Sequence, residues 1–305
     1  MLKHAISTRQ FLDKDLLDKL CSRAAELSEM PLAEYPKPLH YLTIACMFFE
    51  PSTRTRLSFE TAIQNLGGQL ITSENATEFS STNKGETLED TIRTINAYAD
   101  GIIMRHPEIG SAKRAAAVSK VPIINAGDGG GDHPTQALLD LYTIQKAKGK
   151  IDGLKIAIVG DLEHSRTQHA LISLLSIYDV ELYLVSPKIL QLPKSQQDDL
   201  KKKGIPFHNL ENWDEIIGKV DVLYMNRIQK ERFKFIEDYK AVKDSFTLKM
   251  NSVEKMKKDA VIMDPLPRIN EIDVSVDDDP RAIYFDQVKN GLYMRMALLE
   301  YLFDH

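Results

Sequence analysis

The sequence predicts an α/β protein with two domains, each a parallel sheet flanked by helices. Short apolar runs alternate with longer segments of helical periodicity, a pattern typical of parallel sheets covered by helices on both faces. Polar residues follow the ends of several apolar runs, which is where ligands of such sheets bind. The chain has 305 residues, enough for two domains of ordinary size.

The first half of the chain contains one alternating series. A helical pattern over residues 8–30 ends before Pro31. Residues 73–84 form a polar stretch that we expect to be a loop. We expect strands at 41–49, 69–72, 101–104 and 121–124, and helices at 52–66, 85–98, 111–119 and 135–148.

A second series begins at residue 155. The charges of residues 194–203 are mixed, as on a solvated helix face. The polar segment 229–247 lacks strong apolar periodicity, and we expect it to be a mobile loop. We expect strands at 155–161, 181–185, 220–225 and 260–264, and helices at 167–177 and 291–303.

Composition excludes several classes of protein. The net charge of -5 and the pI near 5.9 argue against a general nucleic-acid or membrane surface. The only cysteines, Cys21 and Cys46, have no metal-site spacing, and we interpret them as core thiols. The N-terminus lacks the apolar region of a signal peptide, and no apolar run reaches the length of a membrane span. We therefore expect a cytoplasmic protein without a metal.

The stretch 48–60 places cations at the junction of a strand and a helix. Ser52 or Thr53 can cap the helix that follows Pro51, and Arg54 and Arg56 lie in its first turn. Cations are disfavoured at a helix N-terminus, whereas its unpaired N–H groups attract anions. This pattern indicates a phosphate site, although two solvated arginines on an ordinary surface helix are the simpler alternative.

Polar residues after two later strands should meet that junction at one edge of the sheet. They are Arg105 with His106, and the stretch 128–133. His133 begins a helix, where a neutral imidazole can donate a hydrogen bond to a carbonyl oxygen. A structural, hydrogen-bonded histidine is the alternative interpretation.

In the second half, Arg166 and Arg227 each follow a predicted strand. The turn at Gly160 lacks the glycine spacing of a dinucleotide-binding fingerprint. Two arginines at strand ends suit a dicarboxylate, but pairing with structural carboxylates such as Glu50 or Glu231 is an alternative. The turn that begins at Asp264 could offer its carbonyls to an amine or be only a stiff connection.

With these residues in place, the chain resembles the aspartate/ornithine carbamoyltransferase family over nearly its whole length. Each motif alone is weak, but several in the same order are specific. The resemblance is carried by residues 48–56, 84–87, 104–107, 125–129, 133–141, 226–232 and 265–268.

The resemblance implies carbamoyl transfer from carbamoyl phosphate to the amino group of L-aspartate, without a cofactor. It also implies a carbamoyl phosphate-binding domain over 1–148, completed by a returning C-terminal helix at 288–305, and an aspartate-binding domain over 149–287.

The resemblance further implies a role for each matching residue. The expected phosphate and carbamoyl contacts are Ser52, Thr53, Arg54, Thr55, Arg105, His133 and Gln136, with backbone carbonyls of Pro265 and Leu266. The expected aspartate contacts are Lys84, Arg166, Arg227 and Gln229, and the expected catalytic residues are Arg54, Thr55, Lys84, Arg105 and His133.

The family's catalytic unit is a homotrimer in which Ser80 and Lys84 reach the active site of the neighbouring subunit. Whether zinc- and nucleotide-binding regulatory chains or a dihydroorotase partner join it stays open. Two departures from the family pattern stand out. Asp264 replaces a common histidine, and the glycines at 129–131 predict a loop of greater flexibility.

Two other functions are weighed against this one. Ornithine carbamoyltransferases typically have a cysteine at the position of Pro265 and lack the second carboxylate-binding arginine, which is Arg227 here. An inactive homologue that serves as a scaffold would be expected to have lost residues such as Arg54 or His133, and both are present.

Overall fold

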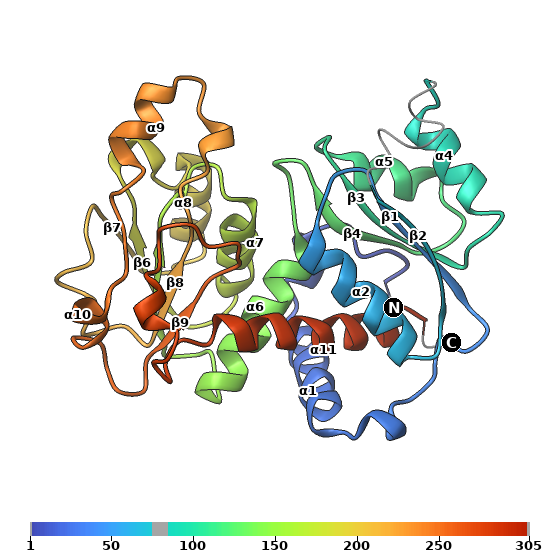
Figure 1. The fold of residues 1–305 in the computed structure, drawn as a ribbon, viewed down its shortest axis with the longest axis horizontal. Helices are drawn as coiled ribbons and strands as arrows, with labels where there is room; N and C mark the ends of the chain where they lie inside the picture. Colours follow the sequence, from blue (N-terminus) through green and yellow to red (C-terminus); the bar gives the residue numbers. More distant parts are fainter. Residues whose placement is uncertain (1, 75–84, 304–305) are drawn as a thin grey trace. The chain divides into compact units, whose positions relative to one another are not determined.

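A computed structural model of the chain describes residues 2–74 and 85–303. The chain divides into two compact units, one of residues Met1–Tyr142 with Val288–His305 and the other of Thr143–Gln287. Each unit contains one parallel sheet flanked by helices (Figure 1). The predicted fold class is therefore confirmed. The division falls inside a helix, after Tyr142.

The first unit is built on a four-stranded sheet in the order β2-β1-β3-β4. Its strands are β1 (Thr43–Phe48), β2 (Gln69–Glu74), β3 (Gly101–His106) and β4 (Ile123–Asp128). Its helices are α1 (Lys14–Glu29), α2 (Thr53–Asn65), α4 (Leu88–Ile95), α5 (Ser111–Val118) and most of α6 (Pro134–Lys148) and α11 (Tyr284–Phe303).

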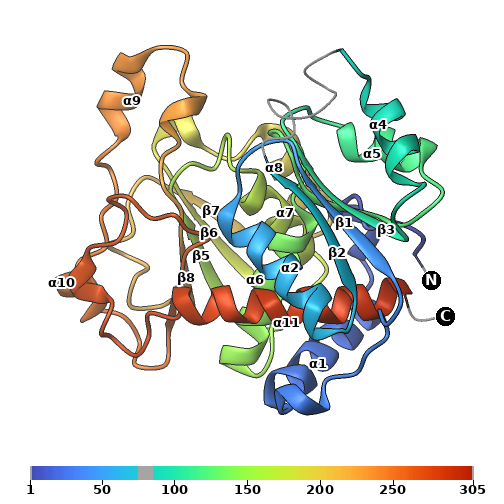
Figure 2. The same cartoon turned by 45° about the vertical axis from the view of Figure 1, so that its right-hand side comes forward.

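Successive side chains of each strand point to opposite faces of this sheet, and helices cover both faces. Met47 and Ile102 pack on one face with Leu88 of α4 and Ala115 of α5, in a single apolar cluster. Helices α2 and α11 lie on the opposite face (Figures 1 and 2). Because both faces are buried, the strands are nearly continuous apolar runs, which is why the sequence reveals them.

The second unit is built on a five-stranded sheet in the order β7-β6-β5-β8-β9. Its strands are β5 (Lys155–Val159), β6 (Glu181–Val185), β7 (Phe207–Leu210), β8 (Val222–Met225) and β9 (Val261–Met263). Its helices are α7 (Arg166–Leu175), α8 (Lys194–Lys202), α9 (Ile236–Val242) and α10 (Met250–Val253), with short 3-10 turns between them.

In both sheets the strand order reverses beside the first strand. The chain goes from β1 outward to β2 and then returns to β3 on the other side of β1. In the second unit it goes from β5 to β6 and β7, then returns to β8 on the other side of β5. Loops that leave two such neighbouring strands diverge and open a crevice at their carboxyl ends, where α/β proteins bind ligands.

Several segments of the structure differ from the prediction. Strand β7 was not predicted, because Phe207–Leu210 is short and half exposed and its two central residues are polar. The expected loop 229–247 contains helix α9, whose half-buried Tyr239 packs on a small cluster with Val242. Helix α11 begins at Tyr284, seven residues before the predicted start at residue 291. The predicted helix over 8–30 begins with a 3-10 turn at Thr8–Phe11.

Both cysteines lie in the core, as predicted. Cys21 is 3% exposed and Cys46 is fully buried. Burial raises the pKa of the Cys21 thiol to about 12, which removes the reactive thiolate at neutral pH. Within the described residues, no helix is both long and apolar enough to cross a membrane.

Close backbone contact holds the ends of β5 and β8 together. Gly160, the residue after β5, has φ +117°, and a Cβ atom built there would lie 2.0 Å from the carbonyl oxygen of Asn226. Asn226 in turn donates through Nδ2 to the carbonyl oxygen of Asp161 at 3.3 Å. Only glycine fits this position, which keeps the two strand ends adjacent.

We predict that Gly160→Ala destabilises the second unit by more than Gly204→Ala does. Gly204 also has a positive φ, +72°, but a Cβ there would meet no atom within 4 Å. The control substitution should therefore lower the free energy of unfolding by about 1 kcal/mol, through the unfavourable backbone conformation alone. The Gly160 substitution adds a steric clash and should lower it by roughly 3 kcal/mol or more. Urea unfolding followed by circular dichroism measures both. Equal midpoints for the two variants would show that the contact at Asn226 is unimportant.

Candidate active site

The N-terminus of α2 offers donors beside the first strand reversal. Ser52 occupies the N-cap position, but in the described part of the chain its side chain makes no capping hydrogen bond, contrary to our expectation. Thr53, Arg54 and Thr55 follow as the first residues of the helix. The backbone N–H groups of a first turn have no partner within their own helix. The helix start therefore presents uncapped donors and the partial positive charge of its dipole to an anion.

The two arginines of this turn have different environments. Arg56 forms ion pairs with Glu60 at 3.1 Å and with Glu74 at 3.0 Å. It thus ties α2 to the end of β2, and the structural alternative applies to it. Arg54 is exposed. Of the two, Arg54 is the one suited to bind an anion.

Arg105 places a second cation at the same strand ends. It lies next to the last residue of β3, directly opposite Phe48, which ends β1. Its guanidinium forms an ion pair with Glu50 at 2.7 Å and donates to the carbonyl oxygen of Ala126 in β4 at 3.3 Å. Residues from three neighbouring strand ends thus meet at Arg105, which confirms the predicted shared edge.

His133 immediately precedes helix α6 on this edge. Its carbonyl oxygen accepts from the backbone N–H groups of Gln136 and Ala137, at 3.0 and 3.2 Å. The imidazole is 4% exposed, and its Nδ1 lies 3.5 Å from Thr135 Oγ1. Gln136 lies in the first turn of α6, and its Nε2 donates to Asp140 Oδ1 at 2.9 Å. We predicted no role for Asp140 from the sequence, although its spacing of four residues from Gln136 places the two on one helix face.

The loop before His133 is held tightly, which differs from the flexibility predicted from its glycines. Gly129 has φ +53°, and a Cβ there would lie 2.2 Å from the carbonyl oxygen of Pro107. The Asp128 carboxylate accepts from the N–H groups of Gly110 and Asp132, at 3.0 and 2.7 Å. Asp132 in turn accepts from Thr8 N at 2.7 Å. Here the glycines permit close backbone approach rather than motion.

In the second unit, two arginines follow the strands of the second reversal. Arg166 is the first residue of α7, in the connection after β5, and Arg227 comes two residues after β8. Arg227 Nη1 donates to Glu231 at 3.1 Å, and this hydrogen bond raises the pKa of Arg227. The Glu231 side chain is 53% exposed. Because the Glu231 side of this pair is open to solvent, a ligand carboxylate can compete with Glu231 for Arg227.

The turn after β9 lies at the edge of the same sheet. Its Pro265 and Leu266 are half buried, and Leu266 has φ +52°. The Asp264 carboxylate accepts from the N–H of Leu266 at 2.6 Å, and Asp264 is only 2% exposed. The carboxyl group that replaces the family's common histidine therefore binds within its own turn. Gln229, the remaining expected aspartate contact, precedes the short 3-10 turn Lys230–Arg232.

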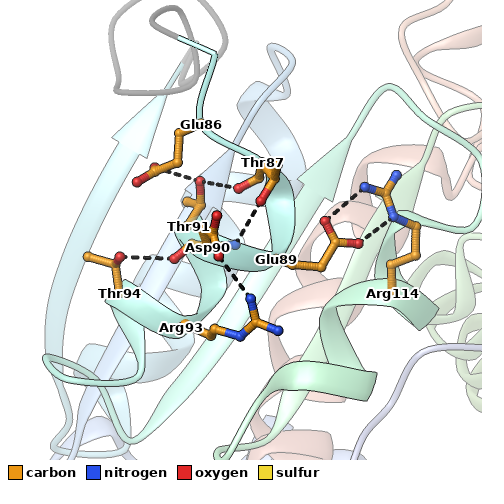
Figure 3. A network of polar contacts seen from close by, with 8 residues as sticks. All are labelled: Glu86, Thr87, Glu89, Asp90, Thr91, Arg93, Thr94 and Arg114. Carbon is orange, nitrogen blue, oxygen red and sulfur yellow. Dashed lines mark hydrogen bonds and ion pairs between the residues drawn. The ribbon is translucent and has the colours of Figure 1, made fainter.

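Ser80 and Lys84 lie outside the described residues. The chain is described again from Gly85, and a polar network holds the start of α4 (Figure 3). Thr87 caps the helix by accepting from Asp90 N at 3.2 Å. Glu89 binds Arg114 of α5 through two hydrogen bonds, at 2.7 and 3.0 Å. This pairing fixes α4 to α5 immediately after the segment that contains Lys84.

The described residues contain no group of three or more His, Cys, Asp or Glu side chains that could hold a metal ion. The polar groups brought together at the edge of the first sheet are instead cations, hydroxyls, an imidazole and an amide. Such groups can bind a phosphate and polarise a carbonyl. The arginines at the edge of the second sheet, Arg166 and Arg227, are suited to bind carboxylates.

Two family models match the chain. One is described as the carbamoyl-P binding domain of aspartate/ornithine carbamoyltransferase and matches residues 3–146. The other is described as the Asp/Orn binding domain of the same family and matches residues 152–302. Together they cover nearly the whole sequence.

Individual relatives and solved structures agree with these models. The aspartate carbamoyltransferase catalytic subunit of Methanocaldococcus jannaschii is 50% identical over 99% of this chain and 98% of its own length. Its solved structure superposes with a TM-score of 0.90, covering 99% of this chain and 98% of that one. The chloroplastic aspartate carbamoyltransferase of Arabidopsis thaliana is 48% identical over 99% of this chain and 78% of its own length.

A further solved structure is that of aspartate transcarbamoylase from Trypanosoma cruzi in complex with carbamoyl phosphate and aspartate. It is 39% identical, has a TM-score of 0.90 and covers 97% of this chain and 96% of that one. With both domain models matched in order and full-length relatives near half identity, the chain belongs to the aspartate/ornithine carbamoyltransferase family.

Proposed function

We propose that this protein is an aspartate carbamoyltransferase, which transfers the carbamoyl group of carbamoyl phosphate to the amino group of L-aspartate. The products are N-carbamoyl-L-aspartate and phosphate, in an early step of pyrimidine synthesis. The observation that carries this proposal is the pair of strand reversals. One bears a helix N-terminus with Arg54 and Arg105, and the other bears Arg166 and Arg227. Relatives of this name at about half identity support it.

The first unit would hold carbamoyl phosphate. The phosphate would bind the start of α2, at Ser52, Thr53, Arg54 and Thr55, with Arg105 as a second cation. Charge-assisted hydrogen bonds of this kind are about twice as strong as neutral ones. Arg105 would exchange its bond to Glu50 for one to the ligand, which is favourable because the dianion carries more charge than one carboxylate.

Three donors would polarise the carbamoyl carbonyl oxygen: Thr55, Arg105 and His133. Thr55 and His133 are buried, at 6% and 4% exposure, so water competes little for their hydrogen bonds. Gln136 would accept a hydrogen bond from the carbamoyl nitrogen. Lys84 is the remaining catalytic residue that we infer from the family.

The second unit would bind aspartate through its two carboxylates. Arg166, Arg227 and Gln229 are the proposed contacts, together with Lys84. Two guanidinium groups favour a dicarboxylate and repel the side-chain ammonium of ornithine. The carbonyl oxygens of Pro265 and Leu266 would accept hydrogen bonds from the attacking amine.

The reaction follows from these contacts. The amine nitrogen of aspartate forms a bond to the carbamoyl carbon while negative charge develops on the carbonyl oxygen. Preorganised donors commonly stabilise such a charge by about 3–4 kcal/mol each. The bond from carbon to the phosphate oxygen then breaks, the electron pair leaves with phosphate, and the phosphate takes the amine proton. Holding both substrates in line supplies much of the remaining acceleration.

We further propose a homotrimer in which Ser80 and Lys84 of one subunit complete the site of its neighbour. Zinc- and nucleotide-binding regulatory chains could join it in a larger assembly. A cytoplasmic location stays a prediction, and the plant relatives are named chloroplastic.

The reaction is tested by phosphate release from carbamoyl phosphate with L-aspartate, with L-ornithine and without an acceptor. We expect release with aspartate alone, because the two arginines of the second unit match two carboxylates. Release with ornithine would show that the function of Arg166 and Arg227 is wrongly assigned. Release with neither acceptor would contradict the proposed reaction as a whole.

Two substitutions should separate the functions of the two units. Arg54→Ala should lower kcat by about a hundredfold to a thousandfold, the usual effect of removing a preorganised donor. Arg227→Ala should mainly raise KM for aspartate. Steady-state kinetics with each substrate varied in turn measures both effects.

The chain offers a matched control for each. Arg56→Ala removes the neighbouring arginine of α2, which is paired with Glu60 and Glu74, and should leave kcat within about threefold. Arg232→Ala removes an exposed arginine near Arg227 and should leave KM for aspartate unchanged. If Arg54→Ala were as active as Arg56→Ala, Arg54 could not have the assigned role.

A further inference from the structure

Two oppositely charged residues are buried inside the first unit beside the proposed carbamoyl contact. Asp140 of α6 is fully buried and Arg295 of α11 is 3% exposed. Removing charged groups from water is expensive, so two buried charges of opposite sign in one unit call for an explanation. Asp140 lies within the motif 133–141, but neither residue is among the expected contacts of the substrates.

The fold makes specific room for Arg295. Its guanidinium carbon lies 5.1 Å from the centre of the Phe59 ring, in the helix whose N-terminus is the proposed phosphate site. A Cβ atom at Gly291, one turn earlier in α11, would lie 2.5 Å from Arg295 Nη1. Glycine inside a helix costs about 1 kcal/mol relative to alanine. Helix α11 therefore loses stability in order to accommodate this guanidinium.

Arg295 remains a cation in this position. Burial lowers its pKa to about 10, and the negative charge of Asp140 opposes that decrease. At neutral pH the guanidinium is therefore protonated, and it attracts the negative charge of Asp140 in a medium of low dielectric constant.

Asp140 determines the orientation of the neighbouring amide. Its Oδ1 accepts from Gln136 Nε2 at 2.9 Å. An ionised carboxylate only accepts hydrogen bonds, so the NH₂ group of Gln136 must face Asp140. The oxygen Oε1 of Gln136 is then directed to the other side of the amide. Without Asp140, the amide could turn over and present either group.

We propose that Asp140, with Arg295 as a buried counter-charge, orients Gln136 so that its amide oxygen selects a carbamoyl group over an acetyl group. This inference rests on the proposed function, and it makes Asp140 and Arg295 positioning residues rather than catalytic ones. The carbamoyl NH₂ donates a hydrogen bond to Gln136 Oε1. Acetyl phosphate has a methyl group of similar size in that place and cannot donate.

The test compares the dissociation constants of carbamoyl phosphate and acetyl phosphate, measured by calorimetry on the whole protein. We expect the wild-type protein to favour carbamoyl phosphate by about tenfold, the value of one good neutral hydrogen bond. Two double variants are then compared with it. The amide variant, Asp140→Asn with Arg295→Met, keeps an acceptor for Gln136 and removes both charges. The apolar variant, Asp140→Leu with Arg295→Met, removes both charges and the acceptor.

Both double variants avoid an unpaired buried charge, so their melting temperatures should be similar. An asparagine at position 140 can either accept from Gln136 or donate to it, so the amide variant should keep only part of the wild-type preference. The apolar variant should bind the two ligands about equally well. A merely structural role would give both variants the same preference. If the leucine of the apolar variant is not accommodated, Asp140→Ala with Arg295→Met tests the same point with a smaller side chain.

The outcomes distinguish this inference from the proposed function. A wild-type protein that binds neither ligand would contradict the proposed function itself. A wild-type protein that binds both ligands equally would overturn the inference alone. So would an apolar variant, with leucine or with alanine in place of the aspartate, that keeps the wild-type preference.

Discussion

The proposed chemistry depends on two pairs of neighbouring parallel strands whose carboxyl ends lie side by side. In the first sheet, Phe48 of β1 lies opposite Arg105 of β3, so a helix N-terminus and a second cation are brought to the same edge. In the second sheet, the contact between Gly160 and Asn226 holds the ends of β5 and β8 together. Strand register, rather than loop sequence, thus determines where the arginines stand.

The arginines at these edges differ in how readily they can bind a ligand. Arg56 is held by two glutamates and has a structural role. Arg105 and Arg227 are paired with Glu50 and Glu231, and we propose that a ligand anion takes the place of these carboxylates. In the interior of the first unit, we propose that Asp140 and Arg295 act on ligand preference through the orientation of Gln136.

The sequence predicted most elements because buried parallel strands are nearly continuous apolar runs. It did not predict β7, a short half-exposed strand, or helix α9, whose apolar contacts are few. Strand order, and with it the two reversals, depends on packing between distant segments and could not be predicted from periodicity. The site residues came from motifs, whereas Asp140, the pairing of Arg56 and the tight loop at Gly129 became evident only from the fold.

The proposed function depends above all on the start of α2 binding the phosphate of carbamoyl phosphate through Arg54. This binding can be measured by calorimetric titration of carbamoyl phosphate, without aspartate, into the wild-type protein and the Arg54→Ala and Arg56→Ala variants. We expect binding that is at least about tenfold weaker in Arg54→Ala and nearly unchanged in Arg56→Ala. Unchanged binding in Arg54→Ala, or an equal loss in both variants, would contradict it.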